Sequence, residues 1–101
     1  QPNIYAPNVF RPSSTAGVNN QFALFAREST INRISRLQVF DRWGNLVFGK
    51  DDILPNDTRA GGWDGRYKGQ MLEPGVFTWW ADIELAGGEH VQMKGDVTIV
   101  D

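Results

Sequence analysis

The alternation of apolar and polar side chains between residues 76 and 85 is the feature that most constrains the fold of this chain. Every second position is apolar: Phe77, Trp79, Ala81, Ile83 and Leu85. The positions between them carry Thr78, Trp80, Asp82 and Glu84. Because successive side chains of a β-strand point to opposite faces of its sheet, this pattern predicts a long strand with one buried face.

Two glycine turns precede this strand. Apolar runs at residues 37–41 and 46–48 flank the first turn, and together they predict a β-hairpin. Gly44 supplies the positive φ that a short hairpin turn requires, and the next residue, an asparagine, tolerates the same conformation. The second turn is Gly62-Trp63-Asp64-Gly65. Here we expect the Asp64 carboxylate to accept a backbone N–H two residues on, with Gly65 in a left-handed conformation.

Further short strands are predicted at residues 21–27, 90–93 and 95–100. The side chains predicted to point inward from them are Phe22, Leu24, Val97 and Ile99. Three prolines between residues 2 and 12 restrict that segment to an edge strand or two short pieces.

Two polar stretches predict irregular structure. Residues 28–36, with Ile31 and Ile34 three positions apart, predict a single helical turn or a loop. Residues 49–62 predict a long surface loop. About seven short strands, frequent turn signals and no convincing helix predict an all-β fold: an Ig-like antiparallel β-sandwich.

Length and composition exclude several classes of protein. A chain of 101 residues is one domain by size, and the absence of cysteine excludes disulfides, thiolate metal sites and cysteine nucleophiles. The net charge of -2 comes from mixed charges, so no basic surface is predicted for nucleic acid or anionic lipid. No segment has the length and hydrophobicity to insert in a membrane. Residues 1–20 lack the pattern of a signal peptide, and the start without methionine suggests a piece cut from a longer protein.

Catalytic interpretations of the polar residues are weak. His90 is the only histidine, and no G-x-S-x-G motif accompanies it, so we expect an exposed residue at a strand end. Asp82 and Glu84 lie two residues apart on one strand face, roughly 6.5–7 Å between Cα atoms, near the carboxyl spacing of inverting glycosidases. The solvated face of a half-buried sheet explains these carboxylates better. We predict no enzymatic activity and no cofactor.

Cation and sugar binding are the remaining alternatives from the residues alone. Oxygen-bearing side chains that could form an irregular calcium site are Asp51, Asp52, Asn56, Asp57 and Asp64. Their spacing does not match an EF-hand, and an acidic solvated loop is the simpler interpretation. Exposed tryptophans on a sandwich can stack on sugar rings. Trp79 is predicted to be core, whereas Trp43 and Trp80 are candidates for such a platform. Alternatively, Trp43 and Trp63 pack back across their glycines and a loop covers Trp80.

The chain also resembles a known family over nearly its whole length. The pieces that carry the resemblance are residues 6–12 (Ala-Pro-Asn-Val-Phe-Arg-Pro), residues 17–22, residues 40–48 (Phe-Asp-Arg-Trp-Gly-Asn-Leu-Val-Phe), Trp63-Asp64-Gly65, Gly69, Pro74-Gly75-Val76-Phe77 and Lys94-Gly95-Asp96-Val97-Thr98. In order and spacing they resemble the gliding motility-associated C-terminal domain family, the type B sorting domains that end cargo proteins of the bacterial type IX secretion system. No single piece is specific, but the combination is.

The resemblance implies a folded export signal. On this basis residues 1–101 are expected to be a single C-terminal sorting domain of a longer secreted protein. The implied partners are the type IX machinery, an outer-membrane partner protein and the upstream cargo domains, with a secreted or cell-surface destination through the periplasm. The first alternative is a carbohydrate-binding or adhesive surface module, with a glycan as partner. The second is a purely structural terminal cap. The residues hypothesised to form the recognition patch are Arg42, Trp43, Gly44, Trp63, Asp64 and Gly65.

Two departures from the family pattern stand out. The first loop, residues 13–20 (Ser-Ser-Thr-Ala-Gly-Val-Asn-Asn), has lost both aspartates of the family's N-G-D-G-x-N-D turn. A cation site or carboxylate-capped turn of that kind is therefore not expected here. Asp101 stands where the family commonly ends with Lys or Arg, which would weaken a signal that depends on a positive C-terminus.

Overall fold

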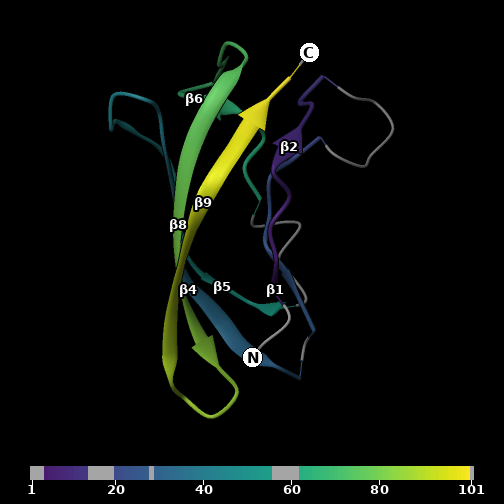
Figure 1. Ribbon diagram of the computed structural model, residues 1–101, viewed down its shortest axis with the longest axis vertical. Helices are drawn as coiled ribbons and strands as arrows, with labels where there is room; N and C mark the ends of the chain where they lie inside the picture. The colour runs from purple at the N-terminus through teal and green to yellow at the C-terminus, as the bar shows by residue number, and fades with distance from the viewer. Residues whose placement is uncertain (1–3, 14–19, 28, 56–61, 101) are drawn as a thin grey trace.

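The computed structural model describes residues 4–13, 20–27, 29–55 and 62–100, and these form an all-β domain (Figure 1). The strands are β1 (Ile4–Tyr5), β2 (Val9–Phe10), β3 (Phe25–Ala26), β4 (Ile31–Phe40), β5 (Leu46–Ile53), β6 (Arg66–Tyr67), β7 (Gln70–Met71), β8 (Gly75–Leu85) and β9 (His90–Ile99). Five of them form one sheet in the order β2-β9-β8-β4-β5, and β1-β3 and β6-β7 form two small two-stranded sheets. The all-β sandwich prediction is confirmed, with nine strands in place of about seven.

The long strands β4, β8 and β9 form the centre of the large sheet, and each pairs antiparallel with its neighbour. β2 departs from a purely antiparallel arrangement, because it pairs parallel with the end of β9 through Val9 and Thr98. An isolated bridge between Phe22 and Trp63 connects the two segments that cover the inner face of this sheet.

The core lies between the large sheet and these covering segments. The predicted alternation of β8 is confirmed: Phe77, Trp79, Ala81 and Ile83 are buried, and Leu85 is partly buried against them. The other side chains predicted to point inward, Phe22, Leu24, Val97 and Ile99, are also buried. The covering segments contribute Trp63, which is among the largest fully buried side chains.

Residues 31–36 were predicted to be a turn or loop, and this prediction is wrong because they form the first half of β4. The register of β4 against β8 shifts between Ile31 and Arg33 and again between Ile34 and Arg36. Each β-bulge inserts an extra residue, so the buried positions of β4 are three apart instead of two. That spacing imitates a helical pattern and hides the strand.

The predicted loop over residues 49–62 is also partly wrong, since β5 extends to Ile53. Its polar residues are compatible with a strand because β5 pairs with β4 on one side only and is the edge of the sheet. Ile53 is buried opposite Ile34, which fixes the end of the strand in the core. The two predicted strands between residues 90 and 100 are one continuous strand, β9.

No helix long and apolar enough to cross a membrane occurs in the described part of the chain.

Candidate functional site

The hairpin turn between β4 and β5 is held by its own backbone and by one carboxylate. The Asp41 N–H donates to the Asn45 carbonyl (2.9 Å), and the Gly44 N–H donates to the Asp41 carbonyl (3.0 Å). Gly44 has a φ of 84°, as the sequence predicted. The Asp41 side chain accepts the N–H groups of Trp43 (2.9 Å) and Asn45 (2.9 Å) through one oxygen and the Asn45 side-chain amide (3.0 Å) through the other.

These bonds favour the ionised form of Asp41. Desolvation by the surrounding turn acts to raise the pKa of this carboxyl, but the hydrogen bonds from Asn45, Trp43 and Gly44 outweigh it. The pKa of Asp41 therefore lies below its ordinary value. The turn is thus an ordered structure held by a carboxylate.

This ordered turn presents a tryptophan and an arginine to solvent. Trp43 is 77% exposed, the highest exposure of any large hydrophobic residue among those described. The guanidinium carbon of Arg42 lies 5.5 Å from the centroid of the Trp43 ring, within the range of a cation–π contact. Each side chain therefore limits the freedom of the other, and we call Arg42, Trp43 and Gly44 the hairpin tip.

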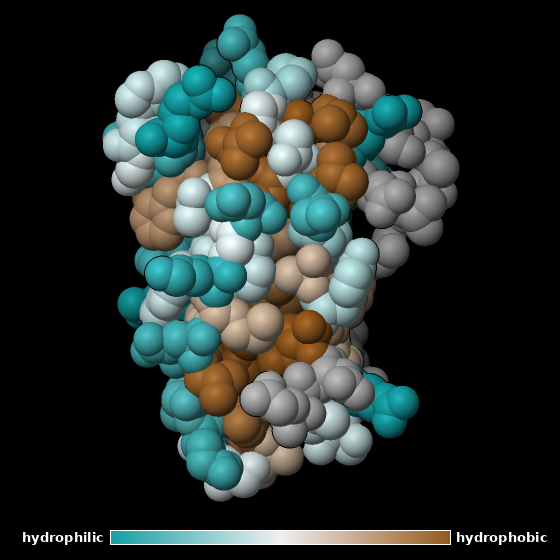
Figure 2. All heavy atoms as spheres, viewed as in Figure 1, coloured by the Kyte–Doolittle hydropathy of each residue, from teal (hydrophilic) through white to brown (hydrophobic). Residues whose placement is uncertain are grey.

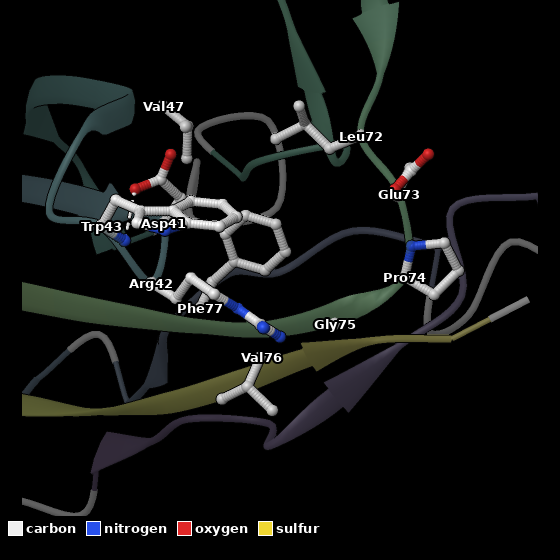
Figure 3. Close-up of a pocket in the computed structure, with 10 residues that line it drawn as sticks. All are labelled: Asp41, Arg42, Trp43, Val47, Leu72, Glu73, Pro74, Gly75, Val76 and Phe77. Carbon is white, nitrogen blue, oxygen red and sulfur yellow. Dashed lines mark hydrogen bonds between the residues drawn. The ribbon is translucent and has the colours of Figure 1, made fainter.

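A half-open pocket of about 350 Å³ lies beside the hairpin tip (Figure 3). Residues from two segments line it: Asp41, Arg42, Trp43 and Val47 from the hairpin, and Leu72, Glu73, Pro74, Gly75, Val76 and Phe77 from the segment that leads into β8. Figure 3 shows the guanidinium of Arg42 extending towards Gly75. The carboxylate of Glu73 points away from the pocket. The pocket therefore combines apolar walls with a cation at its mouth.

The second turn is built differently. Trp63 is 1% exposed, and its ring packs against Phe10, Phe48 and Phe77 at centroid distances of 5.5, 6.4 and 5.2 Å. Its backbone exchanges two hydrogen bonds with Phe22 (2.7 and 2.8 Å), and its indole N–H donates to a backbone carbonyl three residues on (3.0 Å). Trp63 is a central residue of the core.

The predicted local geometry of this turn is confirmed. The Asp64 carboxylate accepts the Arg66 N–H (3.1 Å), and Gly65 has a φ of 82°. Gly65 is buried, and a Cβ there would lie only 2.8 Å from Pro12 Cγ. Asp64 is exposed, and its other oxygen lies 3.7 Å from the Arg66 guanidinium.

The six residues of the hypothesised recognition patch therefore separate into two groups. Arg42, Trp43, Gly44 and Asp64 are exposed. Trp63 and Gly65 are buried, so neither is available to a partner at the surface, and their inclusion in a surface patch is corrected. Sequence reasoning also missed Leu72 and Val76 as pocket walls. The Pro74-Gly75 strand start marks this segment, but only the pairing of β8 with β4 brings it beside the hairpin.

The two carboxylates with glycosidase-like spacing, Asp82 and Glu84, belong to a charged network on the outer face. Asp82 Oδ2 lies 2.7 Å from His90 Nδ1, and Glu84 Oε1 lies 3.8 Å from both His90 Nε2 and Arg33 Nε. Glu84 also accepts a hydrogen bond from the Asn32 amide (2.8 Å). His90 is exposed at the first position of β9, as predicted. This network agrees with a solvated, paired sheet face.

The calcium alternative finds no support in the described residues. Asp51 and Asp52 lie on β5, where they pair with Arg36 (3.1 Å) and Arg33 (3.7 Å). Asn56 and Asp57 lie outside the described residues. Within the residues that are described, no group of three histidine, cysteine or acidic side chains is arranged to hold a metal ion.

Fold and site together define a small all-β domain with an ordered, exposed tip and a neighbouring pocket. The family model of the CHU_C type IX secretion signal domain matches residues 4–99. The chain belongs to this family. It is a sorting signal of the type IX secretion system, and proteins that carry it are exported across the outer membrane to the cell surface or the medium. Family membership indicates a non-enzymatic role and implies interaction with the secretion machinery.

Comparison with solved structures supports the fold. CopC from Methylosinus trichosporium OB3b is similar with a TM-score of 0.60 and 16% identity, over 96% of this chain and 88% of that one. At this identity the likeness concerns the fold alone. The search of curated proteins gave no match.

Proposed function

We propose that residues 1–101 act as the folded C-terminal address of a longer exported protein, and that a component of the secretion machinery reads the hairpin tip. In this proposal Arg42 and Trp43 are the contact residues, and Gly44 sets the turn that presents them. An outer-membrane protein is the partner, and the cargo lies upstream of the domain. The domain performs no catalytic step.

The exposure of Trp43 on an ordered turn is the observation that carries the proposal. A tryptophan that leaves 77% of its surface in water contributes little to the fold but offers a large apolar area to a partner. Tryptophan and arginine are enriched among the residues that dominate binding energy at interfaces. Since the hydrogen bonds of Asp41 already order the turn, a partner that binds it loses less conformational entropy.

Asp64 has a more modest part in the proposal. Its carboxylate already engages the N–H and guanidinium of Arg66, so we assign it to bracing its own turn. The glycan-binding alternative needs a row of exposed tryptophans. Trp43 is the one tryptophan of the four with a large exposed surface, while Trp80 is half-buried on the outer face. A stacking platform is therefore not favoured.

The test is export of a fluorescent reporter fused to residues 1–101 behind a periplasmic signal peptide. The fusion is expressed in a host with a working type IX system and in a translocon-null strain. We expect reporter outside the first cells and in the periplasm of the second. Arg42→Ala and Trp43→Ala are each expected to lower the exported fraction by roughly tenfold or more, the loss typical of an interface hot spot.

Matched controls separate recognition from general surface effects. Tyr5→Ala removes an aromatic ring that is 64% exposed outside the hairpin tip, and Arg27→Ala removes an exposed arginine. Both are expected to be exported like the wild type. Normal export of folded Arg42→Ala and Trp43→Ala proteins would refute the hairpin tip as the recognised surface, and retention of the wild-type fusion in both hosts would refute the address itself.

A further inference from the structure

We infer that the pocket beside the hairpin tip receives an aromatic side chain of a partner protein while Arg42 binds the carboxylate of an adjacent acidic residue. This inference rests on the proposed function and specifies the chemistry of the partner: an extended segment in which an aromatic residue and an aspartate or glutamate are neighbours.

The apolar half of the ligand follows from the walls of the pocket. The side chains of Trp43, Val47, Leu72 and Phe77 surround a space of about 350 Å³, large enough for one aromatic ring with its backbone. Trp43 and Phe77 offer two aromatic rings, and aromatic pairs gain attraction beyond their buried area. The pocket is half open, so a chain can enter and leave it on either side of the inserted residue.

The acidic residue of the ligand is inferred from which charged groups of the pocket already have hydrogen-bond or ion-pair partners. Both oxygens of Asp41 accept hydrogen bonds within the turn, and the Glu73 carboxylate points away from the pocket. Among the described residues Arg42 forms no ion pair, and its guanidinium contacts the face of the Trp43 ring. A cation–π contact with a ring face uses none of the guanidinium N–H groups as hydrogen-bond donors to a carboxylate, and these groups can bind a carboxylate through two parallel hydrogen bonds. The unoccupied charge at the mouth is thus positive.

The surface next to the pocket offers additional apolar contact. Val76 is 49% exposed and belongs to the pocket wall. Val9 is 43% exposed, and both valines are cross-strand neighbours of Thr98 on the outer face of the sheet. Figure 2 shows apolar side chains gathered over the ends of β2, β8 and β9. A segment that leaves the pocket over Val76 would therefore continue across an apolar surface.

The experiment is a titration of the ¹⁵N-labelled protein followed by NMR, with three peptides: acetyl-Phe-Asp-amide, acetyl-Phe-Asn-amide and acetyl-Phe-Lys-amide. We expect shifts at the Trp43 indole N–H and at the backbone N–H groups of Leu72 and Val76. The aspartate peptide is expected to bind roughly tenfold more tightly than the asparagine peptide, because a hydrogen bond between charged groups is stronger than a neutral one.

Two variants test the role assigned to Arg42. Arg42→Gln should remove the preference for aspartate over asparagine, while Arg27→Gln, a change of the same kind elsewhere, should leave it intact. Val76→Glu places a carboxylate in the pocket wall and should weaken binding of the aspartate peptide. Tightest binding of the lysine peptide, an aspartate preference that survives Arg42→Gln, or the absence of shifts at the pocket with all three peptides would each overturn the inference.

The peptide titration and the export assay test the ligand chemistry and the proposed function separately. Loss of export in Arg42→Ala and Trp43→Ala without peptide binding would overturn the ligand chemistry and leave the recognition surface standing. Peptide binding with normal export of both variants would support the ligand chemistry and refute its role in sorting.

Discussion

The two tryptophan-glycine turns of this domain are similar in sequence, but the tryptophan is exposed in one and buried in the other. In each turn a tryptophan is followed within two residues by a glycine at positive φ. An aspartate carboxylate accepts two backbone N–H groups in the first turn and one in the second. Yet Trp43 is 77% exposed and Trp63 is 1% exposed. The same local motif therefore presents one ring to solvent and places the other at the centre of the core.

The difference arises from what each turn is connected to. The first turn closes a hairpin whose strands end at Phe40 and Leu46, so its residues project beyond the large sheet. The second turn is fixed to the covering layer through the hydrogen bonds between Trp63 and Phe22, which direct the Trp63 ring towards the sheet. Local turn chemistry sets the conformation of a turn, whereas long-range pairing sets which side of it is buried.

Replacing the two tryptophans is the strongest test of this comparison. Trp63→Ala removes a ring that three phenylalanines contact and leaves a cavity, so we expect the free energy of unfolding to fall by about 3–5 kcal/mol. Trp43→Ala should change it by less than about 0.5 kcal/mol, since the ring is exposed. Urea unfolding followed by circular dichroism measures both. Similar losses for the two variants would contradict the division into core and surface turns.

Replacing the glycines of the two turns should give a smaller difference in stability than replacing the tryptophans. Gly44→Ala places a Cβ in open space at a φ of 84°, so only the left-handed conformation is unfavourable, at about 1 kcal/mol. Gly65→Ala meets the same backbone cost and also pushes a Cβ to within 2.8 Å of Pro12, for a total of about 2–3 kcal/mol. Thermal unfolding of both variants measures the difference. Equal midpoints would show that Pro12 moves away without cost.

The sequence contains the local part of this structure and little of the long-range part. The alternation of β8 and the positive φ of Gly44 and Gly65 follow from strand periodicity and turn chemistry, which are properties of neighbouring residues. The first half of β4 was missed because its bulges, set by pairing with β8, disturb the alternation. An edge strand such as β5 has no second neighbour, so its polar composition resembles that of a loop.

The candidate site shows the same limit. The exposed Arg42-Trp43 pair could be predicted because a short hairpin turn between two strands projects from its sheet. The sequence allows Trp63 either to lie in a surface patch or to pack back across its glycine. It does not decide between them, because the burial depends on Phe10, Phe22 and Phe77, which are distant in sequence. The pocket is likewise a product of topology, since Leu72 and Val76 reach the hairpin only through the pairing of β8 with β4.

Low pH should destabilise the exposed turn because it protonates Asp41. We expect this loss of stability to be smaller than those of the tryptophan and glycine variants. The pKa of this carboxyl is lower in the folded chain than its ordinary value of 3.8, so its contribution is fully present above pH 3.8 and is lost as the pH falls through the lowered folded pKa. The stability advantage of the wild type over Asp41→Asn should therefore shrink as the pH is lowered through this range.

Urea unfolding at a series of pH values measures that advantage. Asp96→Asn is the control, because Asp96 is an exposed aspartate whose side chain forms no hydrogen bond with the other described residues. NMR titration of the Asp41 carboxyl supplies the direct check, and a pKa above 3.8 would contradict the capping role.

Asparagine keeps one acceptor oxygen where aspartate has two, so Asp41→Asn retains some of the N–H bonds of the turn but not the bond to the Asn45 side chain at the second oxygen. If recognition depends on the order of the turn, the same variant should weaken export of the reporter less than Trp43→Ala does, because it disturbs the position of the ring but leaves the ring in place.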